Sequence, residues 1–188
     1  MIRAFLAIPL PPATIAAITE LRSQLVRRLP EVRWARPETL HLTLRFFGDL
    51  TEESLEKIAE LMLSIGRRYA SFSVTLAGLG AFPQPNRARV FWLGVHEADP
   101  LLALQADLEG RLATIGIPPE SRPFTPHLTL GRHRGRGLPA QAILAEHADL
   151  ECGVLPVDRI ILYESRLRPA GAEHIPRRTV PLSAGDVR

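Results

Sequence analysis

The tetrapeptide His-Leu-Thr-Leu begins at His41 and occurs again at His127, and this repeat constrains the fold more than any other feature of the sequence. Both copies alternate a polar side chain with a large apolar one, and alternate side chains of a β-strand point to opposite faces. His41 and Thr43 are therefore predicted on one face of a strand, and His127 and Thr129 on one face of another. The leucines between them are expected in a core. A chain with two related lobes is the simplest fold that explains the repeat.

Strand and helix patterns alternate on both sides of the repeat. Helices are predicted to start at Pro12, after a cap at Asp49 or Thr51, after a cap at Asp99, and at Pro139. The glycines and prolines of residues 78–87 are typical of a hairpin connection. Strands are predicted over residues 2–8, 40–46, 72–76, 88–95, 127–131, 157–163 and 174–182.

This alternation, combined with hairpins, predicts an α+β fold. We expect a bilobal molecule in which each of two pseudo-symmetric lobes has a mainly antiparallel sheet, with helices on its outer face and a groove between the lobes. No long linker or low-complexity segment separates the halves. Residues 1–188 are therefore expected to form a single domain with intertwined lobes.

The composition indicates an ordinary folded protein of 188 residues, with 46% hydrophobic and 23% charged side chains. Cys152 is the only cysteine, so an intramolecular disulfide and a cysteine-based zinc site are both excluded. No apolar stretch approaches the ~20 residues of a membrane-spanning helix, and the opening segment lacks the features of a signal peptide. We expect a cytoplasmic monomer that does not bind membranes.

The basic side chains are unusual because all but one of the 23 are arginine; the exception is Lys57. The planar fork of arginine pairs well with phosphate, which favours a nucleotide or RNA ligand. A genome rich in GC would produce the same bias, and both interpretations remain open. Neither a phosphate-binding glycine-rich loop nor a metal-ligand spacing occurs, so no cofactor and no metal are expected.

A pair of histidines across a groove suits acid–base chemistry. Imidazole, with a pKa near ~6.5, both accepts and donates protons at neutral pH, so one ring can activate a nucleophile while the other protonates a leaving group. The threonine hydroxyls of the two motifs can donate hydrogen bonds to the oxygens of a phosphoryl group. The repeat therefore predicts a phosphoryl-transfer site in which the two histidines transfer protons and Thr43 and Thr129 bind the phosphoryl group.

Residues 33–48 and 123–132, which contain the two motifs, resemble the signature motifs of the 2H phosphoesterase superfamily. The sequence is most similar to the RNA 2′,3′-cyclic phosphodiesterases, which are also called 2′-5′ RNA ligases. The resemblance covers nearly the whole chain and implies a bilobal α+β fold with a basic groove. It also implies hydrolysis of a terminal 2′,3′-cyclic phosphate of RNA to a 2′-phosphomonoester without a metal. Some members join RNA ends through a 2′-5′ bond without ATP, which is the reverse chemistry.

The resemblance also implies roles for individual residues. His41 would be the general acid that protonates the departing 3′ oxygen, and His127 the general base that activates water, with the reverse assignment left open. Thr43 and Thr129 would bind the phosphate. Arg132 matches a basic residue that follows the second motif in the family, and is expected to bind the substrate.

Other residues near the motifs have two interpretations. The chain has His174 where the family is expected to have an aromatic residue, often tyrosine. The basic loop Arg132–Arg136 could reach RNA phosphates, or be ordinary solvated surface. Trp34 and Phe124 could stack on a base, or pack in the core. Two alternative functions are a non-catalytic module that binds RNA or a nucleotide, and a phosphodiesterase for a small nucleotide such as ADP-ribose cyclic phosphate.

Overall fold

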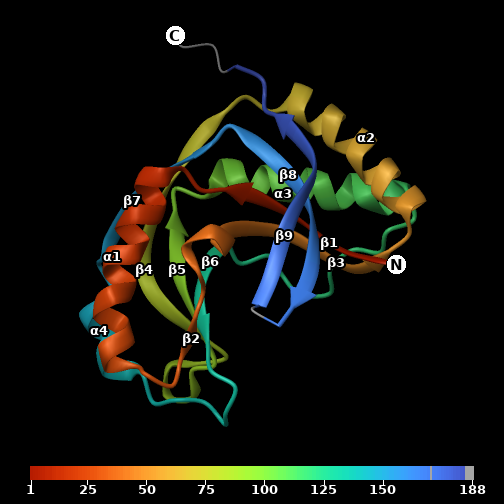
Figure 1. The fold of residues 1–188 in the computed structure, drawn as a ribbon. Helices are drawn as coiled ribbons and strands as arrows, with labels where there is room; N and C mark the ends of the chain where they lie inside the picture. The colour runs from red at the N-terminus through yellow and green to blue at the C-terminus, as the bar shows by residue number, and fades with distance from the viewer. Residues whose placement is uncertain (170, 185–188) are drawn as a thin grey trace.

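The computed structural model describes residues 1–169 and 171–184, and within them it has an α+β fold with two antiparallel sheets (Figure 1). The predicted fold class is confirmed. The strands are β1 (Ile2–Pro9), β2 (Arg33–Trp34), β3 (His41–Leu50), β4 (Phe72–Phe82), β5 (Val90–His96), β6 (His127–Arg132), β7 (Glu151–Val157), β8 (Arg159–Arg168) and β9 (Gly171–Pro181). The helices are α1 (Pro12–Arg28), α2 (Glu52–Arg68), α3 (Asp99–Thr114) and α4 (Gln141–Glu146), with short 3-10 helices η1 (Pro37–Thr39) and η2 (Pro85–Arg87).

The two sheets are built from interleaved parts of the chain. The first sheet has the strand order β3-β1-β8-β9 and the second has the order β2-β6-β5-β4-β7. Each sheet therefore takes strands from both halves of the sequence, and neither lobe corresponds to one half of the chain. β3, at the edge of the first sheet, contacts β6 of the second sheet. The two motif strands lie where the sheets meet.

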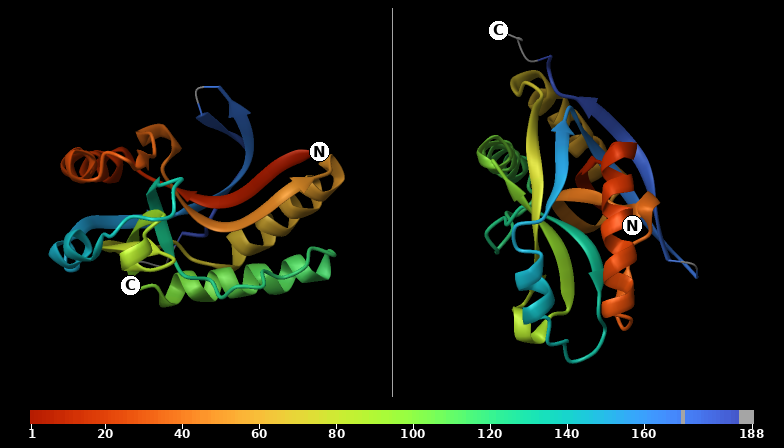
Figure 2. Two further views of the ribbon diagram at one scale, coloured as in Figure 1. Left: turned by 90° about the horizontal axis from the view of Figure 1, so that it is seen from below. Right: turned by 90° about the vertical axis from the view of Figure 1, so that its left-hand side faces the viewer.

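The helices pack against the two sheets (Figure 2), and their buried apolar residues join the hydrophobic core. α2 packs against α3 and against β8 and β9 of the first sheet, while α1 packs against β7 and α4 against β4 of the second sheet. α1 follows β1 of the first sheet along the chain but packs on the second sheet. α1 therefore connects the two lobes.

Local sequence signals explain where α2 and α3 begin and which of their residues are buried. Thr51 caps α2, because its side-chain oxygen accepts a hydrogen bond from the Ser54 N–H at 3.1 Å. Of the two predicted caps, Thr51 is therefore the one used. α3 starts one residue earlier than predicted, with Asp99 as its first residue and Ala98 at the cap position. Both helices bury an apolar stripe on one face, formed by Leu55, Ile58, Met62 and Ile65 in α2 and by Leu101, Leu104, Leu108 and Leu112 in α3.

The connection between β4 and β5 begins later in the chain than predicted. β4 continues to Phe82, so the predicted turn over residues 78–87 is half strand. Gly78 lies at an irregularity of the pairing between β4 and β5 and has a φ of 74°, which favours glycine. Gly80 leaves room for the ring of Trp92, which a Cβ atom would overlap. Both glycines are strand features that resemble turn signals in sequence.

Two strands were not predicted at all. β2 is only two residues long, and β7 follows α4 directly before β8. The prolines and glycines around β7 hide its alternation, yet its apolar residues Cys152, Leu155 and Val157 are buried. No helix among residues 1–169 and 171–184 is long and apolar enough to cross a membrane.

Candidate active site

The first motif lies at the start of β3 and alternates as predicted. His41 pairs with Pro9 and Thr43 with Ala7 of β1, whereas Leu42 pairs with Ile8 and is fully buried. Residues that pair directly in an antiparallel sheet share a face. His41 and Thr43 are half-buried on the face opposite to the leucine core.

The second motif repeats this arrangement at the start of β6. His127 pairs with Gly94 and Thr129 with Trp92 of β5, and Leu128 is fully buried beneath them. His127 and Thr129 are half-buried on the other face. Each motif strand therefore presents one imidazole and one hydroxyl, and the two strands contact each other.

The two histidine rings are held by matching hydrogen bonds. Nδ1 of His41 lies 2.8 Å from the carbonyl oxygen of Thr39, and Nδ1 of His127 lies 2.7 Å from that of Thr125. A carbonyl oxygen only accepts, so each Nδ1 carries its hydrogen and donates it. In the neutral rings, Nε2 is left as the proton acceptor. Both partners stand two residues before their histidine, so the symmetry of the motifs extends to ring orientation.

Aromatic rings surround His41. Its ring centroid is 4.7 Å from that of Phe5, and His174 meets it edge-on at 5.0 Å. Tyr163 stacks on Phe5 at 5.2 Å. His174, the departure from the family pattern, therefore lies directly beside the first motif histidine.

Burial controls the charge of these two histidines. It lowers the pKa of His41 to about 4; the hydrogen bond to Thr39 opposes this, and the charge of His174 adds to it. Burial also lowers the pKa of His174, with a smaller contribution from the positive charge of Arg36. At neutral pH, the His41 ring of the free protein is uncharged.

His127 has aromatic neighbours of its own. Phe82 meets its ring edge-on at 5.0 Å, and the Trp92 centroid lies at 6.2 Å. Trp92 lies over Gly80 of β4, where no side chain blocks it. Neither Phe82 nor Trp92 was predicted from the sequence to lie beside the motif histidine. The signal that could have found them was the pair of strand glycines, Gly80 and Gly94, because glycine inside a strand indicates close approach of another group.

A β-bulge after the second motif decides where Arg132 points. Thr129 pairs with Trp92, but Gly131 pairs with Phe91, so Leu130 is an extra residue in β6. Strict alternation would place Arg132 on the leucine side. The bulge shifts the alternation by one residue, so that Arg132 shares the face of Thr129.

The first motif carries a bulge at the equivalent leucine. Thr43 pairs with Ala7, and Arg45 pairs with Leu6, which leaves Leu44 as the extra residue of β3. Arg45 consequently turns toward the core side, where it is 8% exposed. Phe46 lies on the same face as Thr43 and is 53% exposed. Phe46 and Arg132 are thus equivalent positions of the two motifs.

The other residues that the sequence singled out, Trp34, Phe124 and the basic loop, contribute less to the face that carries the motif histidines. Trp34 and Phe124 are half-buried and pack against the hydrophobic core, which supports the packing interpretation for both. Arg134 and Arg136 of the basic loop are exposed. Across the part of the chain that the structure describes, no group of three or more His, Cys, Asp or Glu side chains could hold a metal ion.

Known proteins are similar to this chain in sequence and in fold. The RNA 2′,3′-cyclic phosphodiesterase of Methanothermobacter thermautotrophicus is 35% identical over 173 residues, which are 90% of this chain and 93% of that protein. The Aeropyrum pernix protein of the same name is 37% identical over 160 residues, or 84% of this chain and 90% of its own length. The crystal structure of TT0787 of Thermus thermophilus superposes with a TM-score of 0.84 at 29% identity, covering 97% of this chain and 99% of that one.

A family model described as the 2′-5′ RNA ligase superfamily matches residues 10–168, which include both motifs and the strands that carry them. This match confirms the resemblance seen in the sequence. The chain belongs to the 2′-5′ RNA ligase superfamily of 2H phosphoesterases.

Proposed function

We propose that this protein is a metal-independent phosphodiesterase that hydrolyses the 2′,3′-cyclic phosphate at the end of an RNA strand to a 2′-phosphomonoester. The observation that carries the proposal is the pair of matched histidines, each with Nδ1 bound to a carbonyl and Nε2 left for proton transfer. Relatives named RNA 2′,3′-cyclic phosphodiesterase match 84% to 90% of the chain, which supports the substrate class.

The reaction assigns one proton transfer to each histidine. Nε2 of His127 takes a proton from water as the water oxygen attacks phosphorus, and His41 gives its proton to the 3′ oxygen as the bond between phosphorus and that oxygen breaks. Thr43, Thr129 and Arg132 bind the non-bridging oxygens, where negative charge grows in the transition state. Proton exchange with water then returns both rings to their starting states.

The low pKa of His41 sets a condition on its role as the acid. A ring with a pKa of about 4 is neutral in the free protein at pH 7. A negative charge next to an imidazole raises its pKa, so the anionic cyclic phosphate promotes protonation of His41 as it binds. The acid is therefore formed in the complex with substrate.

The activity is tested with EDTA-treated protein and an oligoribonucleotide that ends in a 2′,3′-cyclic phosphate. We expect a 2′-phosphate product, and kcat lower by about 10²- to 10⁴-fold in His41→Ala and in His127→Ala. Full activity in both variants would contradict the two-histidine mechanism. RNA binding without turnover in the wild type would instead support the non-catalytic module.

The acid and the base are separated with a substrate whose bridging 3′ oxygen is replaced by sulfur. A thiolate leaves without being protonated, so this substrate has little need of a general acid. We expect His41→Ala to recover most of the wild-type rate on it, while His127→Ala stays slow. Recovery by His127→Ala alone would reverse the two assignments.

A further inference from the structure

Two arginines face each other next to the second motif. Arg33 of β2 pairs directly with Arg132 of β6, so both lie on the face that carries His127 and Thr129. Like charges in directly opposite positions destabilise a sheet. Neither arginine forms an ion pair with a carboxylate among residues 1–169 and 171–184. An anionic ligand would relieve this repulsion.

A third arginine converges with Arg33 on the tip of the β8–β9 hairpin. The Nη2 atoms of Arg33 and Arg36 lie 3.7 and 3.8 Å from the position that a Cβ atom would take at Gly171. Gly171 has a φ of 124°, which a residue with a side chain rarely adopts. Arg36 is also oriented by a hydrogen bond that its Nη2 donates to the carbonyl oxygen of Ala172 at 2.9 Å.

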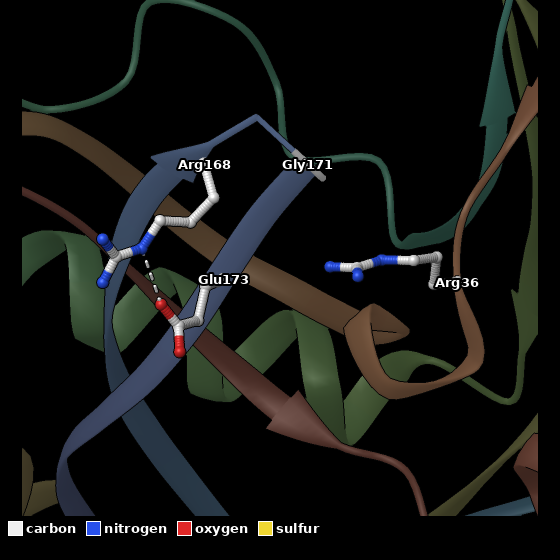
Figure 3. A pocket seen from close by; sticks show the side chains of 4 residues that line it. All are labelled: Arg36, Arg168, Gly171 and Glu173. Atoms are coloured by element: carbon white, nitrogen blue, oxygen red, sulfur yellow. Dashed lines mark hydrogen bonds and ion pairs between the residues drawn. The ribbon is translucent and has the colours of Figure 1, made fainter.

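A pocket of about 530 Å³ opens at this point, lined by Arg36, Arg168, Gly171 and Glu173. Figure 3 shows Arg36 reaching toward the hairpin, while Arg168 and Glu173 pair with each other on the hairpin itself. Arg36 has a carboxylate neighbour in Glu38 at 3.5 Å, and Arg168 has Glu173 at 3.1 Å. Arg33 therefore adds a positive charge that no nearby carboxylate balances among the residues described.

Arg36 lies close to the histidine site, because its positive charge contributes to the lowered pKa of His174. His174 stands three residues along β9 from Gly171, a distance of about 10 Å along a strand. The His174 ring lies 5.0 Å from that of His41. A chain that leaves the histidines toward the hairpin tip would meet the arginines within one or two nucleotides.

We propose that Arg33 and Arg36 form a subsite for the internucleotide phosphate of RNA immediately upstream of the cyclic end. Guanidinium groups match phosphate oxygens in charge and geometry, and two of them converging on one glycine can hold a single phosphate from two sides. The inference rests on the proposed function and narrows its substrate. The subsite favours an RNA strand over a cyclic mononucleotide, which has no upstream phosphate.

The test compares a nucleoside 2′,3′-cyclic monophosphate with a tetraribonucleotide that ends in a 2′,3′-cyclic phosphate. The variants are Arg33→Gln, Arg36→Gln and the double variant. Arg67→Gln serves as the matched control, because Arg67 is exposed in the last turn of α2 on the outer side of the first sheet. Thermal unfolding verifies that each variant is folded.

We expect the ratio of kcat/KM for the tetranucleotide to kcat/KM for the mononucleotide to fall at least tenfold in the double variant and to stay constant in Arg67→Gln. Because kcat/KM for the tetranucleotide falls as salt is added, the slope of log kcat/KM against log salt concentration is negative. This slope should become less negative by about one for each arginine–phosphate interaction that a variant removes. An unchanged ratio in a folded double variant overturns the subsite, while turnover of both substrates still supports the proposed function.

A second readout keeps the two proposals separate. Fluorescence anisotropy measures the affinity for a labelled tetranucleotide that ends in a 2′-phosphate. If the wild type hydrolyses neither substrate, the proposed function fails, and a loss of affinity of tenfold or more in the double variant still supports the subsite. Equal affinity of the double variant and the wild type contradicts it.

Discussion

The imidazole rings of His41 and His174 meet edge to face, with centroids 5.0 Å apart. The two residues come from β3 and β9, at opposite edges of the first sheet, and the aromatic ring of Phe5 on β1 contacts both. A proton on either ring raises the cost of a proton on the other, in surroundings that already disfavour charge. His174 thus acts on the electrostatics of the site from a position where its relatives are expected to have an aromatic residue.

The His41 ring is expected to titrate far below an ordinary histidine. An NMR titration of the folded protein should give a pKa of about 4 for His41, and His174→Gln should raise this pKa because it removes a positive charge nearby. The C–H resonances of both rings report the two values separately. A pKa of His41 near ~6.5 in the wild type would contradict the burial of its charge.

The same shift makes stability depend on pH. The folded-state pKa of His41 lies below its unfolded value of ~6.5, so the unfolded chain binds more protons between about pH 6.5 and pH 4. The associated stability is fully present above pH 6.5 and is lost as the pH falls through this window, by about 3 kcal/mol. Denaturant unfolding at pH 7.5 and pH 4 should show a smaller loss for His41→Gln than for the wild type. An equal loss would show that other groups account for the pH dependence.

Gly80 is expected to be essential for the position of the Trp92 ring beside His127. Valine at this position would overlap the Trp92 ring, which lies next to His127, so we expect Gly80→Val to lower the free energy of unfolding by about 1 to 3 kcal/mol and to reduce kcat. Gly110→Ala in α3 is the matched control, because a Cβ atom there meets nothing within 4 Å. That substitution should stabilise the protein by up to about 1 kcal/mol. Tolerance of valine at Gly80 would show that Trp92 can move without consequence.

Arg45 is expected to connect the first motif to the segment that leads into the second. It donates a hydrogen bond to the carbonyl oxygen of Pro118 at 2.7 Å and pairs with Glu109 at 3.4 Å and Glu120 at 3.3 Å. Arg45→Leu leaves the largely buried Glu109 without this cation, which should cost about 2 to 4 kcal/mol in chemical denaturation. Hydrogen exchange should increase over residues 117–126. Unchanged exchange in that segment would limit Arg45 to a local role.

The histidine motifs and their faces could be predicted from sequence because they depend on local periodicity. His41, Thr43, His127 and Thr129 stand two residues apart within each motif, and strand alternation places each pair on one face. The stripes of α2 and α3 were predictable for the same reason, since burial of one helix face leaves a repeat of three and four residues in the chain.

The bulges could not be predicted from either motif alone. Arg132 faces the histidines because Leu130 has no pairing partner in β5. This is a property of the pairing between strands, which one motif alone does not reveal. The same holds for Phe46 and Leu44 in β3. An alternating pattern specifies a face only as long as the register is regular.

The sequence by itself determined the four helices, seven of the nine described strands, the α+β class and the two residue pairs that the chemistry needs. Each of these follows from side chains close together along the chain. Only the tertiary structure decided that the lobes exchange strands and helices, that His174 lies beside His41, and that Arg33 and Arg36 meet at Gly171. The physical reason is that these contacts join residues far apart in sequence. Such contacts arise from the packing of whole sheets, which leaves no periodic trace in the sequence around any one of them.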